Sequence, residues 1–175
     1  MNKILRNHLI ASLLAVAGAT NAADVPAIDQ PAETPVYTIK ESVIGSNIPR
    51  IVVSSALPFD KTYGQLTLEQ RNIIRQDYES LGLGDDPPFP QHGLRELVTP
   101  IYRVAVKAGA SGVLKAAVEV DSQGVGRSVS ILKSPGPDVS RMTELALMQE
   151  NFKPATCKGQ PCVMKYIFYI NLVPH

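Results

Sequence analysis

Two cysteines are the residues whose spacing has the most definite chemical meaning. Cys157 and Cys162 are the only cysteines in the chain, and Lys158-Gly159-Gln160-Pro161 between them is a turn-forming stretch. Two thiols this close in an oxidising compartment normally pair, and closing so short a loop stabilises a fold by roughly 2 kcal/mol. A redox dithiol is the alternative, but such pairs usually lie two residues apart at a helix start. The spacing therefore favours a structural disulfide.

The remaining reactive side chains form no catalytic or metal-binding pattern. The three histidines are His8, His92 and His175, and no four-ligand spacing exists. Asp60 and the pair Asp85-Asp86 are possible acids, but carboxylates in loops are ordinarily solvated. No nucleophile–base arrangement is visible around His92. We therefore expect no catalytic residues, no metal and no cofactor, and the hypothesis of a small secreted enzyme would rest on His92.

The charge balance argues against nucleic acid as a partner. The 175 residues include 17 Lys and Arg against 16 Asp and Glu, a formal net charge of +1. Proteins that bind nucleic acid carry a basic patch or stripe, often interleaved with aromatic residues, and this sequence has neither.

The N-terminus has the three parts of a secretory signal peptide. Lys3 and Arg6 supply positive charge, 9–19 is apolar, and Thr20-Asn21-Ala22 offers small or uncharged residues for cleavage. An uncleaved anchor helix is the alternative, but the apolar run is shorter than the ~20 residues that cross a bilayer. Cleavage after Ala22 would leave 15 basic against 16 acidic residues. We expect an exported protein with no membrane span after cleavage.

The rest of the N-terminal half divides by composition. Residues 23–62 predict an extended, proline-containing leader with a possible strand pair at 36–43 and 50–57. Residues 63–90 predict a helix over 67–81, opened by a Thr67–Gln70 capping box and closed by Gly82, then a proline-rich extended segment. We assign 1–22 to the signal peptide and 91–175 to the main domain.

Periodicity within 91–175 changes from helical to alternating. Apolar residues at helical spacing predict a helix from Leu94 to Ala108, in which Pro100 either bends the helix or begins a new one. Alternation predicts strands at 114–120 and 125–131, joined by a turn at Asp121–Gly124. A short helix beginning at Asp138 or Ser140 and a strong strand over 162–172 follow. The predicted fold is α+β: a three-stranded antiparallel sheet (β-β-α-β preceded by a helix) with helices on one face, plus an N-terminal helical and extended extension.

An ordered set of motifs in this region resembles the C-terminal domain of TonB-type energy transducers, over residues of about 88–172. Each motif is weak by itself, but their order and spacing follow the family pattern. In sequence order they are Gly112, Val120-Asp121, Gly124, Ser134-Pro135-Gly136, Phe152-Lys153-Pro154-Ala155, Gly159-Gln160-Pro161 and the aromatic strand at 166–172. The segment Pro87-Pro88-Phe89-Pro90 is similar to the family's Pro-x-Tyr-Pro segment, with Phe in place of Tyr.

The resemblance implies that the protein binds a partner by β-strand addition. In the family the last strand lies at a sheet edge and pairs with an extended segment of an outer-membrane receptor, which implies a periplasmic location and a link to TonB-dependent transport. The edge residues implied here are Val163, Lys165, Ile167, Tyr169 and Asn171. Pro88, Phe89 and Pro90 form a second, weaker candidate contact. The alternative is that residues 36–57 of the same chain already occupy the edge.

Energy transduction is not expected from the resemblance. A force-transmitting transducer needs a membrane anchor and a long proline-rich spacer, and we expect neither here. The sequence thus favours a non-catalytic protein that binds a periplasmic or outer-membrane protein. The alternative is a structural or assembly protein that forms a homodimer through the same edge strand.

Overall fold

The structure is a computed structural model that describes residues 34–39 and 51–174 of the chain. The predicted signal peptide (1–22), most of the predicted leader and residues 40–43 of the first predicted strand lie outside the described residues. Within them, no helix has the length and apolar character needed to cross a bilayer.

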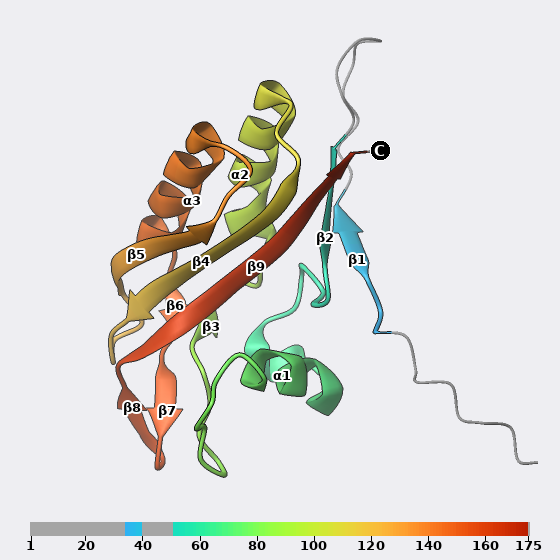
Figure 1. Ribbon diagram of the computed structural model, residues 1–175. Coiled ribbons are helices and arrows are strands. Elements are labelled where there is room, and N and C mark those ends of the chain that lie inside the picture. Colours follow the sequence, from blue (N-terminus) through green and yellow to red (C-terminus); the bar gives the residue numbers. More distant parts are fainter. Residues whose placement is uncertain (1–33, 40–50, 175) are drawn as a thin grey trace, which may run out of the picture. The chain divides into compact units, whose positions relative to one another are not determined.

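The protein is α+β, and a five-stranded antiparallel sheet forms its centre (Figure 1). The strand order is β1-β2-β9-β4-β5, with β1 at Tyr37–Ile39, β2 at Ile51–Ser55, β4 at Gly112–Val120, β5 at Gly126–Lys133 and β9 at Met164–Pro174. The sequence predicted three of these strands as the sheet. The observed sheet is larger because β2 continues it beyond β9 and β1 continues it beyond β2.

The β4–β5 hairpin has the turn that the sequence predicted. Asp121 accepts hydrogen bonds from the backbone N–H groups of Gln123 and Val125 at 2.8 and 2.9 Å. Gly124 has φ +84°, and a Cβ there would clash with the carbonyl of Phe152. The Phe152 N–H in turn donates to the Gly124 carbonyl at 2.9 Å. Glycine is needed here both for the left-handed backbone and for this close approach.

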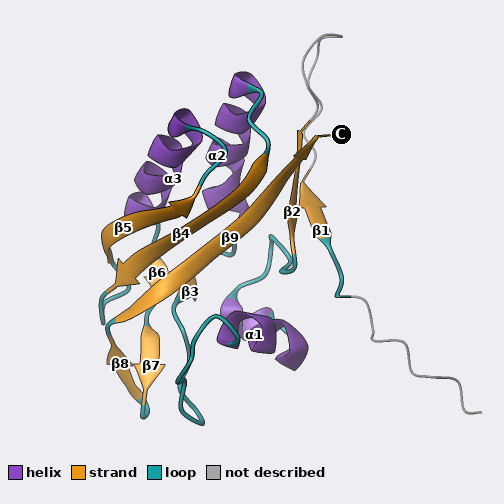
Figure 2. Cartoon of the chain, in the orientation of Figure 1, coloured by secondary structure: helices purple, strands orange, loops and turns teal. Residues whose placement is uncertain are grey.

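Alternation along β9 separates a buried face from an exposed one. Tyr166, Phe168, Ile170 and Leu172 are each at most 3% exposed, whereas Tyr169 is 49% exposed. The buried face packs beneath α2, at Arg95–Ala108, and α3, at Pro137–Gln149, which cover the same side of the sheet (Figure 2). The expectation of helices on one face holds for these two.

The paths of α2 and α3 near their prolines are clear in the structure. Pro100 lies inside α2, which runs as one helix to a left-handed Gly109 cap. The helix α3 begins after Gly136 with Pro137 in its first turn, and neither Asp138 nor Ser140 caps its N-terminus with a side chain. Proline is tolerated in a first turn because the N–H it lacks has no partner there.

The first helix forms at the predicted place but is shorter. α1 spans Leu68–Arg75, after a 3₁₀ turn η1 at Tyr63–Gln65, and its predicted capping box is present. The Gln70 N–H donates to the Thr67 hydroxyl at 3.2 Å, and the Thr67 N–H donates to the Gln70 amide oxygen at 3.0 Å. The helix ends six residues before the predicted end at Leu81, and Tyr78 therefore belongs to the loop that follows.

Two small ribbons complete the fold. β3 (Phe89–Pro90) pairs with β6 (Phe152–Lys153), and β7 (Ala155–Cys157) pairs with β8 (Gln160–Cys162). Cys157 and Cys162 close the second ribbon as a disulfide, with Cα atoms 5.8 Å apart. The structural disulfide that the sequence favoured is therefore present.

Candidate functional site

The two flanks of β9 differ in how completely they are paired. Toward β4, every residue from Met164 to Leu172 has an antiparallel partner. Toward β2, the pairing covers only Asn171–Pro174. Residues 164–170 have no strand on that flank among the described parts of the chain. We call residues 164–170, on the side that faces away from β4, the open flank.

The last strand is therefore not an edge strand over its whole length. β9 is the third of five strands, and β2 lies within the segment that the sequence offered as an alternative occupant of the edge. Of the five implied edge residues, Asn171 is paired with Ser54 and is not available. The expectation of a free edge is wrong at Asn171, where the chain supplies its own strand.

The odd-numbered residues of β9 direct their main-chain groups toward the open flank. The Ser54 hydroxyl donates to the Asn171 carbonyl at 3.4 Å, and the Tyr78 hydroxyl donates to the Lys165 carbonyl at 2.7 Å. Main-chain groups alternate in direction along a strand. Ile167 and Tyr169 are the odd-numbered residues between Lys165 and Asn171. Their main-chain groups therefore also face the open flank.

Tyr78 lies at the end of the open flank that begins with Met164. Besides its hydrogen bond to Lys165, its hydroxyl accepts a backbone hydrogen bond from Ile167. Burial raises the pKa of Tyr78, and the Ile167 bond opposes this rise. The hydroxyl thus meets two main-chain groups that an added strand would otherwise pair with. Tyr169 is left as the odd-numbered residue without such a partner within the described chain.

Several hydrogen bonds hold the loop that carries Tyr78. The Arg75 guanidinium donates to the carbonyl of Gly82 at 3.0 Å and to that of Asp85. At its other end, α1 is fixed to β1, because the Gln70 amide donates to the Tyr37 hydroxyl at 2.8 Å. α1 therefore lies between β1 and the lower half of β9, where β2 has separated from β9 (Figure 1).

A cavity of about 290 Å³ lies beside the open flank. Its walls come from β9, from α1 with the following loop, and from the turn after β2. The lining residues are Ser55, Ala56, Leu57, Ile73, Ile74, Gln76, Asp77, Leu94, Tyr166, Ile167 and Tyr169. Most of them are apolar, so the cavity suits an apolar side chain held next to the main chain of Tyr169.

Asp77 is the charged group among the described residues that line the cavity. Burial raises the pKa of Asp77, and the positive charge of Lys115 on β4 partly offsets that rise. When burial disfavours the ionised form of a carboxyl group, a nearby cation or hydrogen-bond donor stabilises that form. Asp77 therefore favours a ligand that brings a donor to this wall.

The other predicted strand residues lie outside the cavity. Val163 precedes β9 and is 60% exposed, beside the disulfide ribbon. Lys165 is exposed on the helix-free face of the sheet, and its carbonyl is the group that Tyr78 meets. The structure therefore brings Ile167 and Tyr169 together at the cavity and leaves the remaining three residues outside it.

The proline-aromatic segment is part of the core. Phe89 is 0% exposed and its ring lies 6.0 Å from the rings of both Tyr63 and Tyr166, centroid to centroid. Pro88 and Pro90 are also buried, and Phe89 and Pro90 form β3. In this conformation the segment offers no surface to a partner, because its side chains are buried in the core next to β9.

The disulfide ribbon also has an anchoring role. The Lys158 N–H donates to the Asp85 carboxylate at 2.7 Å, and Asp86 and Thr156 exchange backbone hydrogen bonds of 2.9 and 2.8 Å. The Asp86 carboxylate accepts from the Tyr63 hydroxyl at 2.9 Å. The acidic pair Asp85-Asp86 thus connects the ribbon to the loop after α1.

Within the described chain, no hydrogen bond or ion pair joins His92 to Asp60, Asp85 or Asp86. His92 is exposed, and Asp60 forms an ion pair with Arg95, with one oxygen–nitrogen distance of 2.6 Å. Hydrogen bonding to Arg95 lowers the pKa of Asp60. Across the described residues, no three His, Cys, Asp or Glu side chains cluster as metal ligands would.

Comparison with known proteins adds no relative. No protein-family model matches the chain, and a search of curated proteins finds no match. The interpretation of the site therefore rests on the geometry described above and on the sequence motifs.

Sequence reasoning missed the part of the site contributed by the N-terminal half. Tyr78 was assigned to a helix face, and the turn after β2 was assigned to a leader. The only sequence signal for this part of the site was the possible strand pair at 36–43 and 50–57. Nothing in that pattern indicated that the second strand would end beside the cavity.

Proposed function

We propose that this protein is a non-catalytic periplasmic interaction module, similar to TonB C-terminal domains, which binds an extended segment of a partner protein at the open flank of β9. The observation that carries this proposal is that, among residues 34–39 and 51–174, no strand pairs with Met164 to Ile170 of β9 on the side toward β2. Unpaired main-chain groups on a strand are a template for another extended chain.

The proposed segment is short. The stretch between the Tyr78 contact at Lys165 and the first β2 pair at Asn171 is six residue steps, or about 20 Å at the rise of a β-strand. A partner that pairs with the main chain of Tyr169 and displaces the Tyr78 hydroxyl from Ile167 would therefore insert about four to five residues. It would continue the line of β2 and replace water on the main-chain groups of Tyr169.

The cavity supplies specificity. Successive side chains of an added strand point to opposite sides, so one of them would enter the cavity between Leu57 and Ile73 while its neighbours face solvent. An aliphatic or aromatic side chain fits the apolar wall. A donor next to it would pair with Asp77, whose ionised form is then stabilised.

The first test is crosslinking in cells that make the protein. A photoreactive phenylalanine analogue at Tyr169 should give one defined crosslinked partner. The same analogue at Glu119, an exposed position on β4, should not. Equal products from both positions would contradict a site at the open flank.

The second test uses the partner segment that crosslinking identifies, as a synthetic peptide in titration calorimetry. Replacing Tyr169 by Pro removes a main-chain N–H that faces the open flank, and proline is tolerated where the N–H has no strand partner. Tyr169→Pro should abolish binding, whereas Tyr169→Ala should only weaken it. Binding of the proline variant at wild-type affinity would exclude strand addition.

Self-association is the competing outcome. If the crosslinked partner is a second copy of the chain, sedimentation should show a concentration-dependent dimer that Tyr169→Pro dissociates. That result would replace the proposed partner by the assembly function.

A further inference from the structure

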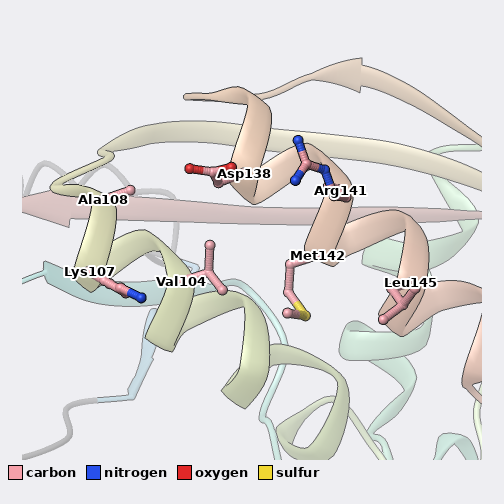
Figure 3. A pocket seen from close by; sticks show the side chains of 7 residues that line it. All are labelled: Val104, Lys107, Ala108, Asp138, Arg141, Met142 and Leu145. Atoms are coloured by element: carbon pink, nitrogen blue, oxygen red, sulfur yellow. The ribbon is translucent and has the colours of Figure 1, made fainter.

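A second groove lies on the opposite side of the sheet from the exposed face of β9, on the outer surface of the two helices. It is formed between the C-terminal half of α2 and the part of α3 from Asp138 to Leu145, and its volume is about 480 Å³. Figure 3 shows its lining side chains, which run from Lys107 and Ala108 at one end to Leu145 at the other. None of them contributes to the open flank or to its cavity.

The floor of the groove is apolar and partly uncovered. Val104 from α2 and Met142 from α3 face each other across it and are half-buried (Figure 3). Leu145 is 53% exposed, and Met148 on the next turn of α3 is 44% exposed. Exposed apolar side chains that follow one side of a helix indicate a binding surface, and methionine adapts to ligands of varied shape.

Two cations line this apolar floor, one from each helix. Lys107 belongs to α2 and Arg141 to α3, and neither forms a hydrogen bond or an ion pair with another described residue. The groove holds one carboxylate, Asp138, in the first turn of α3, where the helix dipole favours a negative charge. The groove therefore carries a net positive charge next to an apolar floor.

We propose that this groove binds a free, single-chain alkyl carboxylate, that is, a fatty acid of medium length. Its carboxylate would be attracted to Lys107 and Arg141, and its chain would cover Val104, Met142 and Leu145. The charge of the groove selects an anion, and the apolar floor selects an aliphatic chain. The groove volume is in the range of small-molecule sites, about 300–1,000 Å³.

The size of the groove argues against a protein partner. Seven side chains of the described residues line it. A stable protein interface involves about 20–30 residues on each side. A protein bound here would have to place most of its interface outside the groove. A small amphiphile can be held by the groove alone and fits it better.

The test is titration calorimetry of the purified, disulfide-bonded protein with sodium decanoate below its micelle concentration. Replacing octanoate by decanoate should tighten binding by about two- to fourfold per added methylene. Lys107→Gln and Arg141→Gln should each weaken binding by about two- to fivefold. Asp138→Asn should strengthen it, because it removes the carboxylate that repels the ligand. Lys133→Gln on β5 is the matched control and should change nothing.

Amide chemical-shift mapping locates the ligand independently of these affinities. Decanoate should shift the amide signals of residues in α2 and α3 and leave those of Ile167 and Tyr169 unchanged. Because the two sites are separate, a negative result at the groove would not affect the proposed function. The proposal is overturned if decyltrimethylammonium binds as well as decanoate or if the glutamine variants bind normally. It is also overturned if phosphatidylglycerol vesicles bind while decanoate does not, or if sedimentation shows a dimer that covers the groove.

Discussion

The two flanks of β9 belong to one strand, yet they have different surroundings. Toward β4 the strand has a partner at each residue from Met164 to Leu172, and its alternate side chains are buried beneath α2 and α3. Toward β2 the pairing stops at Asn171, and a tyrosine hydroxyl and a cavity take the place of a strand. A strand in the middle of a sheet can therefore be paired along its whole length on one side and only at its end on the other, as β9 is within the described chain.

The largest effect should come from the side chains that β9 directs at the core. Phe168 is 0% exposed, and Phe168→Ala should lower the free energy of unfolding by about 3–5 kcal/mol, from lost burial and the cavity left behind. The neighbouring Tyr169→Ala is the control and should change it by about 0.5 kcal/mol or less. Urea denaturation measures both. Equal losses would mean that both faces of β9 are packed alike.

Removing the disulfide should have the next largest effect. Replacing both Cys157 and Cys162 by serine should cost about 2 kcal/mol of stability, because the closed loop is short. The ribbon also holds Asp85 through Lys158, so the loop after α1 should exchange its amide hydrogens faster. Urea denaturation and hydrogen exchange measure the two effects. An unchanged loop would show that the ribbon does not support the open flank.

A smaller effect is expected from the hydroxyl that meets the open flank. Tyr78→Phe removes the hydrogen bond to the Lys165 carbonyl and should cost about 0.5–1.5 kcal/mol. The same change should tighten binding of a strand-forming peptide, because the peptide no longer competes with the hydroxyl. Weaker peptide binding by this variant would indicate that Tyr78 belongs to the binding surface.

Ionisation of Tyr63 should destabilise the protein above about pH 10. Burial, followed by the hydrogen bond to Asp86 and its charge, raises the pKa of Tyr63 to about 12, and an unfolded tyrosine ionises near 10. Between these values the unfolded state loses its proton first, so the free energy of unfolding falls as pH rises. Urea denaturation at pH 8, 9, 10 and 11 should show a flat region followed by a decline. Tyr63→Phe should reduce the slope of that decline.

The sequence predicted elements with local signals and missed those that depend on distant pairing. The Thr67 cap, the Gly124 turn and the alternation along β9 are set by neighbouring residues, and each is present. The five-stranded sheet is not a local property. Ile51–Ser55 is equally β-prone whether it pairs with β9 or with another strand, and the short pattern did not fix its partner.

The candidate site was predicted less completely than the fold. Ile167 and Tyr169 were named from the sequence because they belong to the strongest predicted strand, and both line the cavity. Asn171 was assigned to the wrong environment because β2 lies more than 100 residues earlier in the sequence. The role of Phe89 was also obscured, since an aromatic residue among prolines has the same sequence pattern whether it is exposed or buried.

The pairing of β2 with β9 also has a consequence for how the chain folds. Ser54 and Asn171 are separated by 117 positions, while the β4–β5 and β1–β2 pairs can each form early because they are close in sequence. Both early pairs can join only through β9, the last strand of the sheet to be synthesised. Closing so long a loop is entropically costly and slows the search for native contacts. Until β9 is complete, β1–β2 and β4–β5 are separate partial sheets, and the strand edges that β9 later covers on β2 and β4 are open.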